Sequence, residues 1–312
     1  MYLAIDGGGT KTEYLLLDEQ FREKGHFLGG CINHDFLPDG WQGTRREIEN
    51  GIARLAEQCA GAEERIQDVV VGASGIDTAV DQRMLEQILE DLKIPQYLVC
   101  NDGYLPVKAS ARGGVGVAYN CGTGVCCAGI DRDGRLVNVA GLDEWSDDAG
   151  SGRWIVLSMF QKVYASAIRK EQETGLVRTF REEFSAWSKE DILNLYTKFR
   201  DPIGYPQEAV QMIALFFELL EKGDPDAVEL AHRMSVCAAE NIGYVIEHLN
   251  FPANESVQVV LTGSIHTKAA GQRYFEMLEK QIAVPGGRKA ELKLSEEKPI
   301  RGAAEWLRER HG

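Results

Sequence analysis

The sequence has no long apolar run, no recognisable leader segment and no excess of positive charge. No stretch approaches the roughly 20 apolar residues that a membrane-spanning helix needs. No basic segment followed by an apolar one precedes the first expected strand at residues 2–5, which argues against a secretory signal. We therefore expect a cytoplasmic protein that does not bind a membrane.

The charge balance and the cysteines exclude further classes. Lys and Arg number 34 against 48 Asp and Glu, a net charge of −14, whereas broad nucleic-acid binding needs a cationic surface. Backbone amides and magnesium can still bind a nucleotide phosphate locally. The seven cysteines are irregularly spaced and form no CxxC pair. Cys126 and Cys127 are adjacent on an expected strand and so face opposite ways, which suits no simple metal site. We expect reduced, mostly buried thiols.

Two glycine-rich turns carry most of the information that is present. The first is IDGGGTKT at residues 5–12 and the second is YNCGTG at residues 119–124. Each lies between two short runs that are typical of β-strands. A tight glycine turn between strands lets backbone N–H groups point at an anion. Two such turns predict two related halves that bind the same phosphate chain.

The rest of the chain alternates strand and helix patterns, which predicts an α/β fold with largely parallel sheets. In the first half we expect strands at 2–5, 14–17, 25–30, 69–73 and 97–100, with helices at 41–59 and 80–92. In the second half we expect strands at 115–119, 125–130, 136–140, 257–261 and 290–294, with helices at 151–170, 206–222, 226–249, 266–282 and from Ile300. The polar segment 174–206 is expected to be an insertion with short helical patches.

Four motifs in this order resemble the actin-like ATPase (sugar kinase/Hsp70/actin) superfamily. They are the two turns, VVLTGSI at 259–265 and PIRGAA at 299–304. The resemblance covers essentially the whole chain. It is closest to the N-acetylglucosamine kinase branch and the BadF/BadG/BcrA/BcrD ATPases.

The resemblance implies an α/β fold of two ribonuclease H-like domains with a central cleft and a helical insertion in the second domain. The expected domains are 1–115 on the sugar side and 116–299 on the nucleotide side. A helix at 300–312 is expected to pack back on the first domain. We expect a hinge near residues 113–116.

The same resemblance assigns an ATP and Mg²⁺ site. Asp6 is expected to hold the magnesium, through water. The expected phosphate and adenosine contacts are Asp6, Gly8, Gly9, Thr10, Lys11 and Thr12 from the first turn, Gly122, Thr123 and Gly124 from the second, and Gly263 and Ser264 after the strand at 257–261.

Asp102 is the expected catalytic base. It follows the strand at 97–100, and α/β sheets place ligands at the carboxyl ends of their strands. In similar sugar kinases the aspartate at this position contacts the sugar and accepts the proton of its 6-hydroxyl. The alternative is a helix-capping turn at residues 101–103, where aspartate is also favoured.

The remaining expected sugar contacts are Asn33, His34, Ser74, Gly75, Gly141 and Asp148. Ordinary loop and cap polarity is the alternative for all of them. The last two lie in AGLDEWSDDAGSGRW, which is similar to the family's GGWGHxxGDEGSGYW but departs from it. Leu142 replaces a tryptophan, Asp143–Glu144 replaces Gly–His, and Ala149 replaces a glutamate. The acetamide pocket is therefore the part that the sequence leaves open.

The predicted function is ATP-dependent phosphorylation of the 6-hydroxyl of an amino sugar, with N-acetylglucosamine as the first expectation. Glucosamine, N-acetylmuramic acid or another hexose stay open. One alternative is an ATPase activator that drives electron transfer to an acyl-CoA dehydratase or reductase through a cysteine-bound iron–sulfur cluster, but no cysteine lies in the glycine-rich context of those activators. Another is a non-catalytic binder of sugar or nucleotide, which the presence of Asp6 and Asp102 argues against. Relatives are commonly homodimers, so a homodimer is expected.

Overall fold

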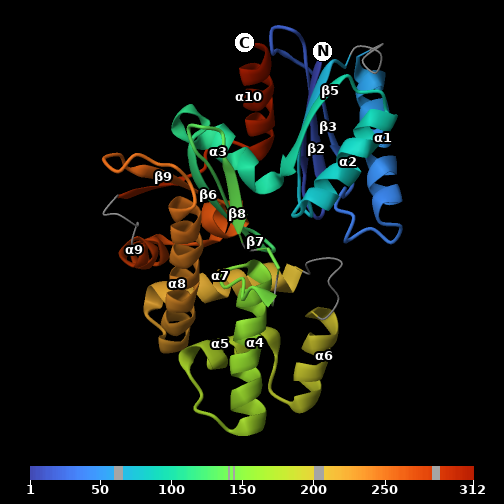
Figure 1. Ribbon diagram of the computed structural model, residues 1–312. Coiled ribbons are helices and arrows are strands. Elements are labelled where there is room, and N and C mark those ends of the chain that lie inside the picture. The colour runs from blue at the N-terminus through green and yellow to red at the C-terminus, as the bar shows by residue number, and fades with distance from the viewer. Residues whose placement is uncertain (60–65, 140, 143–144, 200–206, 283–288) are drawn as a thin grey trace. The chain divides into compact units, whose positions relative to one another are not determined.

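The chain forms two compact units. The computed structural model describes residues 1–59, 66–139, 141–142, 145–199, 207–282 and 289–312 (Figure 1). Unit 1 comprises Met1–Ala118, Ala128–Leu136 and Ser295–Gly312, and unit 2 comprises Tyr119–Cys127 and Val137–Leu294. Each unit is described by itself.

The first sheet has five strands in the order β3-β2-β1-β4-β5. Their bounds are β1 Tyr2–Gly7, β2 Thr12–Leu17, β3 Glu23–Gly29, β4 Asp68–Ala73 and β5 Gln96–Asn101. The first three strands form an antiparallel meander, β4 then pairs parallel to β1, and β5 pairs parallel to β4. All six residues of β4 are buried, as expected for a parallel strand that is covered on both faces. This order brings the carboxyl ends of β1, β4 and β5 to one edge of the sheet.

Helices cover the first sheet. The helices of unit 1 are α1 Trp41–Gln58, α2 Ala79–Asp91, α3 Leu105–Ser110 and α10 Pro299–His311, with 3-10 turns η2 Asp102–Tyr104 and η3 Arg112–Gly114. A core of fully buried aliphatic residues, among them Leu3, Ile48 and Val71, joins β1, α1 and β4. The closing helix α10 packs against α3 and β1. Their backbones approach so closely that a Cβ on Gly302 would lie 1.9 Å from the carbonyl oxygen of Leu105.

The second sheet repeats the order of the first. Read from its other end, its strands run β8-β7-β6-β9-β10, which are the third, second, first, fourth and fifth strands of that half, as in the first sheet. Their bounds are β6 Gly116–Cys121, β7 Val125–Ile130, β8 Leu136–Val139, β9 Val257–Thr262 and β10 Ala290–Leu294. The predicted α/β class and its two related halves are confirmed.

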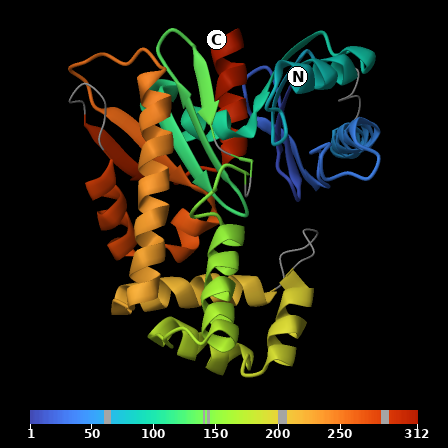
Figure 2. The same cartoon turned by 60° about the horizontal axis from the view of Figure 1, so that its bottom comes forward.

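Helices make up most of unit 2 (Figure 2). They are α4 Gly152–Arg169, α5 Gly175–Phe184, α6 Lys189–Phe199, α7 Gln207–Lys222, α8 Pro225–Glu247 and α9 Gln272–Gln281. The sequence pattern located α4, α7 and α8 closely. The helix expected at 266–282 is instead two pieces, a π-helix η5 at Ile265–Ala269 and then α9. Ala270 and Gly271 have extended backbone conformations and separate the two pieces. Glycine is unfavourable inside a helix, which is consistent with a break at Gly271.

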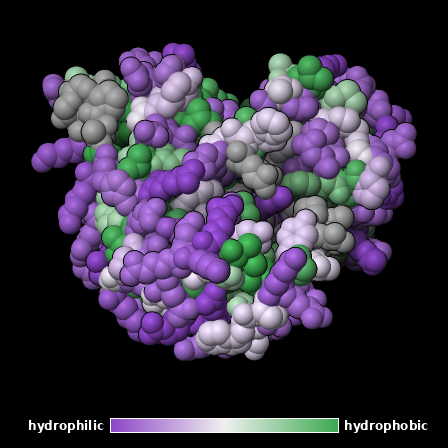
Figure 3. All heavy atoms as spheres, turned by 90° about the horizontal axis from the view of Figure 1, so that it is seen from below, coloured by the Kyte–Doolittle hydropathy of each residue, from purple (hydrophilic) through white to green (hydrophobic). Residues whose placement is uncertain are grey.

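Among the described residues, no helix is both long and apolar enough to cross a bilayer. Figure 3 shows hydrophilic side chains over most of the face it views, with hydrophobic residues in small separate groups. The negative net charge of the sequence is in keeping with such a surface.

Candidate active site

The first glycine turn is a tight hairpin between β1 and β2. Gly7 pairs with Thr12, and the N–H of Gly8 donates to the carbonyl oxygen of Lys11 at 2.9 Å. Thr10 and Lys11 are exposed at the tip of this turn. Thr12 differs from them, because its hydroxyl is buried and has no partner among the described residues. The side chains at the tip of the turn are therefore open to a ligand, whereas the hydroxyl of Thr12 is not.

Two carboxylates stand at the strand ends of unit 1. Asp6 is the next-to-last residue of β1, and Asp102 directly follows β5 as the first residue of η2. Burial, with the nearby charge of Asp102, raises the pKa of Asp6 to about 7 from 3.8. Burial, with the charge of Asp77, raises the pKa of Asp102 to about 7. A cation beside them would favour their ionised forms, which suits a site that binds Mg²⁺.

Asn101 fixes the backbone around Asp102. Its side-chain oxygen accepts from the N–H of Gly103 at 2.9 Å, and its amide donates to Asp77 at 2.9 Å. Asn101, rather than Asp102, is therefore the capping residue of this short turn. The backbone N–H groups of Asp102 and Gly103 donate to the Asp102 carboxylate, and the charge of Asp77, a second acid that the sequence analysis did not identify, acts on it as well. Burial and the charges of Asp81 and Asp35 raise the pKa of Asp77 as well.

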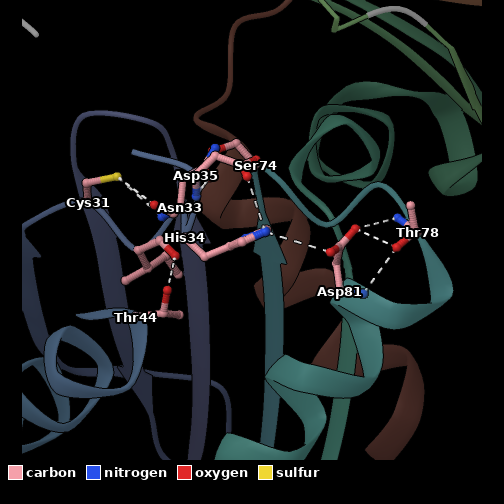
Figure 4. Close-up of polar contacts among 9 residues, drawn as sticks. Cys31, Asn33, His34, Asp35, Thr44, Ser74, Thr78 and Asp81 are labelled. Atoms are coloured by element: carbon pink, nitrogen blue, oxygen red, sulfur yellow. Dashed lines mark hydrogen bonds and ion pairs between the residues drawn. The ribbon is translucent and has the colours of Figure 1, made fainter. Parts of the chain in front are cut away.

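Three of the expected sugar contacts, Asn33, Ser74 and Gly75, lie together after the end of β4, and Figure 4 shows the first two. The amide nitrogen of Asn33 donates to the hydroxyl of Ser74 at 3.3 Å, and its oxygen accepts from the N–H of Asp35 at 2.9 Å. A Cβ on Gly75 would lie 2.6 Å from the Asn33 oxygen, so this close approach needs glycine. Asn33 is buried, and its contacts join two loops that are 41 residues apart in the chain.

The ring of His34 contacts an aromatic side chain and two carboxylates of unit 1. Its ring stacks on Trp41 with centroids 4.0 Å apart. Its Nε2 lies 3.4 Å from Asp35 and 3.7 Å from Asp81, and Thr78 caps α2 together with Asp81 (Figure 4). Trp41 and Asp81 were not predicted as part of this cluster. A signal for Asp81 was available, since a Thr-x-x-Asp capping box opens the helix that follows β4.

The second glycine turn joins β6 to β7 in unit 2. The N–H of Gly122 donates to the carbonyl oxygen of Gly124 at 2.9 Å. The start of α4 holds the turn, because the N–H of Gly152 donates to Gly122 at 2.8 Å. A Cβ on Gly122 or Gly124 would meet no protein atom within 4 Å. Nothing in the described protein therefore requires glycine here, whereas the close approach of a bound ligand would.

Gly263 and Ser264 follow β9 and lie beside the end of β6. Gly263 has φ +85°, and a Cβ on it would lie 2.1 Å from the carbonyl oxygen of Cys121. Ser264 directly precedes the π-helix η5, and single turns of π-helix are frequent at functional sites. Nδ1 of the buried His266 ring donates to the carbonyl oxygen of Thr262 at 2.8 Å, which ties η5 to the end of β9.

Gly141 and Asp148 also lie together. The carboxylate of Asp148 is buried and accepts from the N–H of Gly141 at 3.4 Å and from the hydroxyl of Ser146. Asp143 and Glu144, where the sequence departs from the family pattern, lie outside the described residues. In the described ranges, no cluster of three or more His, Cys, Asp or Glu could hold a metal by itself.

Comparison with known proteins identifies relatives of the chain. The model of the BadF/BadG/BcrA/BcrD ATPase family matches residues 3–306. An N-acetyl-D-glucosamine kinase of Dictyostelium discoideum is 25% identical over 278 residues, 84% of each chain. An N-acetylmuramic acid/N-acetylglucosamine kinase of Clostridium acetobutylicum is 24% identical over 200 residues, 62% of each chain. The solved structure of a candidate N-acetylglucosamine kinase from Chromobacterium violaceum has a TM-score of 0.65 and 17% identity, over 97% of each chain.

Proposed function

Since the chain belongs to the BadF/BadG/BcrA/BcrD ATPase family, we propose that it is an ATP-dependent kinase that phosphorylates the 6-hydroxyl of an amino sugar. N-acetylglucosamine is the first substrate to test, because both curated relatives above act on it by name. The observation that carries the proposal is the repeated strand order with a glycine turn after the first strand of each sheet. The two carboxylates at the strand ends of the first sheet add the groups that the chemistry needs.

We propose that backbone N–H groups of the two turns bind the phosphates of ATP. For the second turn this is supported by Gly122 and Gly124, where a Cβ would contact no protein atom within 4 Å and so would leave the space to a ligand. Gly263 and Ser264 are proposed to line the adenosine. Thr10 and Lys11 are exposed at the first turn and are proposed to donate to phosphate oxygens. A role for Thr12 requires a ligand that reaches its buried hydroxyl.

Asp6 is the proposed magnesium residue. Mg²⁺ keeps several waters and is commonly held by one or two carboxylates together with substrate phosphates. A single partly buried carboxylate fits that donor set better than a site built from protein ligands alone. When bound, the ion would neutralise charge on the transferring phosphoryl group.

Asp102 is the proposed general base. A base works best when its pKa lies near the operating pH, and the pKa of Asp102 is raised to about 7. Asn101 caps its turn, and the backbone N–H groups of Asp102 and Gly103 donate to its carboxylate, which favours the ionised form that a base needs. Asp102 would accept the proton of the sugar hydroxyl as the phosphoryl group is transferred. Asn33, His34, Ser74, Gly75, Gly141 and Asp148 are the proposed sugar contacts.

Several wider features belong to the same proposal. They are the domains 1–115, 116–299 and 300–312, the hinge near 113–116, a homodimer and a cytoplasmic location. Size-exclusion chromatography with light scattering tests the dimer directly.

A coupled ADP-release assay tests the function. Purified protein is given Mg·ATP with N-acetylglucosamine, glucosamine, N-acetylmannosamine, N-acetylmuramic acid or glucose, and with no sugar. ADP release that depends on one of these sugars supports the kinase. Equal ADP release without any sugar contradicts it and favours an ATPase that drives a protein partner.

A further inference from the structure

Two side chains of unit 2 donate hydrogen bonds to the carboxylate of Asp147. Arg233, on α8, donates to one oxygen through Nε at 3.2 Å and Nη2 at 2.6 Å. Trp154, in the first turn of α4, donates its indole N–H to the other oxygen at 3.2 Å. The guanidinium also lies 5.5 Å from the Trp154 ring centroid, within reach of a cation–π attraction. We call Asp147, Trp154 and Arg233 the Asp147 clamp.

The backbone at Asp147 is in an unusual state. Its φ is +48°, in the left-handed region that costs energy for every residue except glycine, although aspartate and asparagine adopt it more readily than most. Its carbonyl oxygen accepts from the thiol of Cys237 at 3.5 Å and from the N–H of Ala149. The clamp and these two contacts together hold a kink that would otherwise relax.

The kink sets the direction of the next residue. Asp148 is 3% exposed, and its carboxylate receives the N–H of Gly141 and the hydroxyl of Ser146. Because Asp147 and Asp148 share a peptide bond, a change of φ at Asp147 swings the Asp148 carboxylate away from those donors. The clamp therefore acts on Asp148 through the backbone, from a place where Arg233 itself is more than half exposed.

We propose that Asp147 and Arg233 are positioning residues for the sugar: the Asp147 clamp fixes the left-handed kink that aims the Asp148 carboxylate, and so sets the affinity for the sugar. This rests on the proposed kinase function and on the sugar contact proposed for Asp148. The clamp residues do not touch the sugar in this scheme. They contribute to substrate binding and leave nucleotide binding alone.

The variant Asp147→Gly distinguishes a role of the Asp147 carboxylate from a role of its backbone conformation alone. Glycine adopts φ +48° at no steric cost, so a purely conformational role predicts normal or better sugar binding. The clamp predicts the reverse, since glycine has no carboxylate for Arg233 and Trp154. We expect the KM for N-acetylglucosamine to rise about tenfold, which corresponds to one weakened charge-assisted hydrogen bond to the sugar. The KM for ATP and the kcat should stay within threefold of the wild type.

Arg233→Met removes the cation from the other side and should raise the same KM, while Arg233→Lys should restore part of the affinity. Arg178→Met is the matched control. Arg178 is 61% exposed and pairs with Glu173 at 3.3 Å, close to the 59% exposure of Arg233, but it lies on α5 away from the clamp. This control should leave both KM values unchanged.

Should Asp147→Gly fail to fold, Asp147→Asn carries the same test, because asparagine tolerates the left-handed backbone but loses the charge. Sugar KM values within threefold of the wild type in both Arg233→Met and the Asp147 variant overturn the proposal. So does an equal rise in the KM values for sugar and ATP. A wild-type protein that releases no ADP with any sugar overturns the proposed function itself, so the two failures are distinguishable.

Discussion

Replacing Asp102 with asparagine should stabilise the ligand-free protein at neutral and alkaline pH while removing its activity. Burial and the charge of Asp77 raise the pKa of Asp102 to about 7, so the folded protein disfavours the ionised carboxylate. Asparagine has nearly the same shape and carries no charge. It also cannot accept the proton of a hydroxyl, and loss of a general base costs about 10²- to 10⁴-fold in turnover.

The size of the stability gain follows from the pKa. A rise from 3.8 to about 7 is about 3 pH units, or about 4 kcal/mol at 1.36 kcal/mol per unit. Asp102 is only partly buried, and solvent screening reduces the figure, so we expect about 2 kcal/mol. The sign follows from linkage: a carboxyl with a raised folded-state pKa binds its proton more tightly when folded. Its contribution to stability is complete below the unfolded pKa and is lost as the pH rises through about 7.

Urea denaturation of wild type and Asp102→Asn at about pH 4.5 and pH 8 measures this. The variant should exceed the wild type in free energy of unfolding by about 2 kcal/mol at pH 8 and by much less at pH 4.5. Asp18→Asn is the control, because the partly buried Asp18 accepts hydrogen bonds from Arg22 that lower its pKa, and its loss should bring no gain at pH 8. A variant that is no more stable than the wild type at pH 8, or a gain that is the same at both pH values, would refute the reasoning.

Four further outcomes are expected. The kcat/KM of the wild type should fall about tenfold per pH unit below about pH 7, as Asp102 becomes protonated, and an acid limb near pH 4 would speak against its role. Gly302→Ala should lower the free energy of unfolding by about 1 to 3 kcal/mol or more, because its Cβ would meet Leu105, and a melting temperature equal to that of the wild type would contradict the close packing of α10 on α3. Gly122→Ala should leave thermal stability unchanged but raise the KM for ATP, whereas Gly263→Ala should lower stability as well. Chelation of Mg²⁺ by EDTA should abolish activity, and excess Mg²⁺ should restore it.

The fold could be predicted from the sequence because the patterns that indicate it, apolar runs and glycine turns, are local and occur in both halves. The apolar runs that became β1 and β4 are continuous, as strands covered on both faces require, and the glycine turns marked where strands reverse. The break between η5 and α9 escaped the pattern. Apolar spacing there continues across Ala270 and Gly271, so periodicity alone indicates one helix.

The candidate site was only partly predictable. Asn33, Ser74 and Gly75 were expected together and do lie together, because their loops follow strands that end at one edge of the sheet. Asp77 was missed, since nothing in a loop sequence says that its carboxylate will reach Asn101 across 24 residues.

The Asp147 clamp was missed for a related reason. Its pairing with Arg233 spans 86 residues and joins α8 to the turn that precedes α4 in unit 2. Long-range pairs of this kind depend on tertiary structure, which periodicity and turn motifs do not encode.

The most direct test of the kinase proposal is to identify the product. Wild-type protein is incubated with Mg·ATP and each sugar of the panel, and the products are analysed by ³¹P NMR and mass spectrometry. We predict one sugar 6-phosphate, formed in equal amount with ADP and at a rate lowered about 10²- to 10⁴-fold with Asp102→Asn. ADP without any phosphorylated sugar, in every reaction of the panel, would contradict the account.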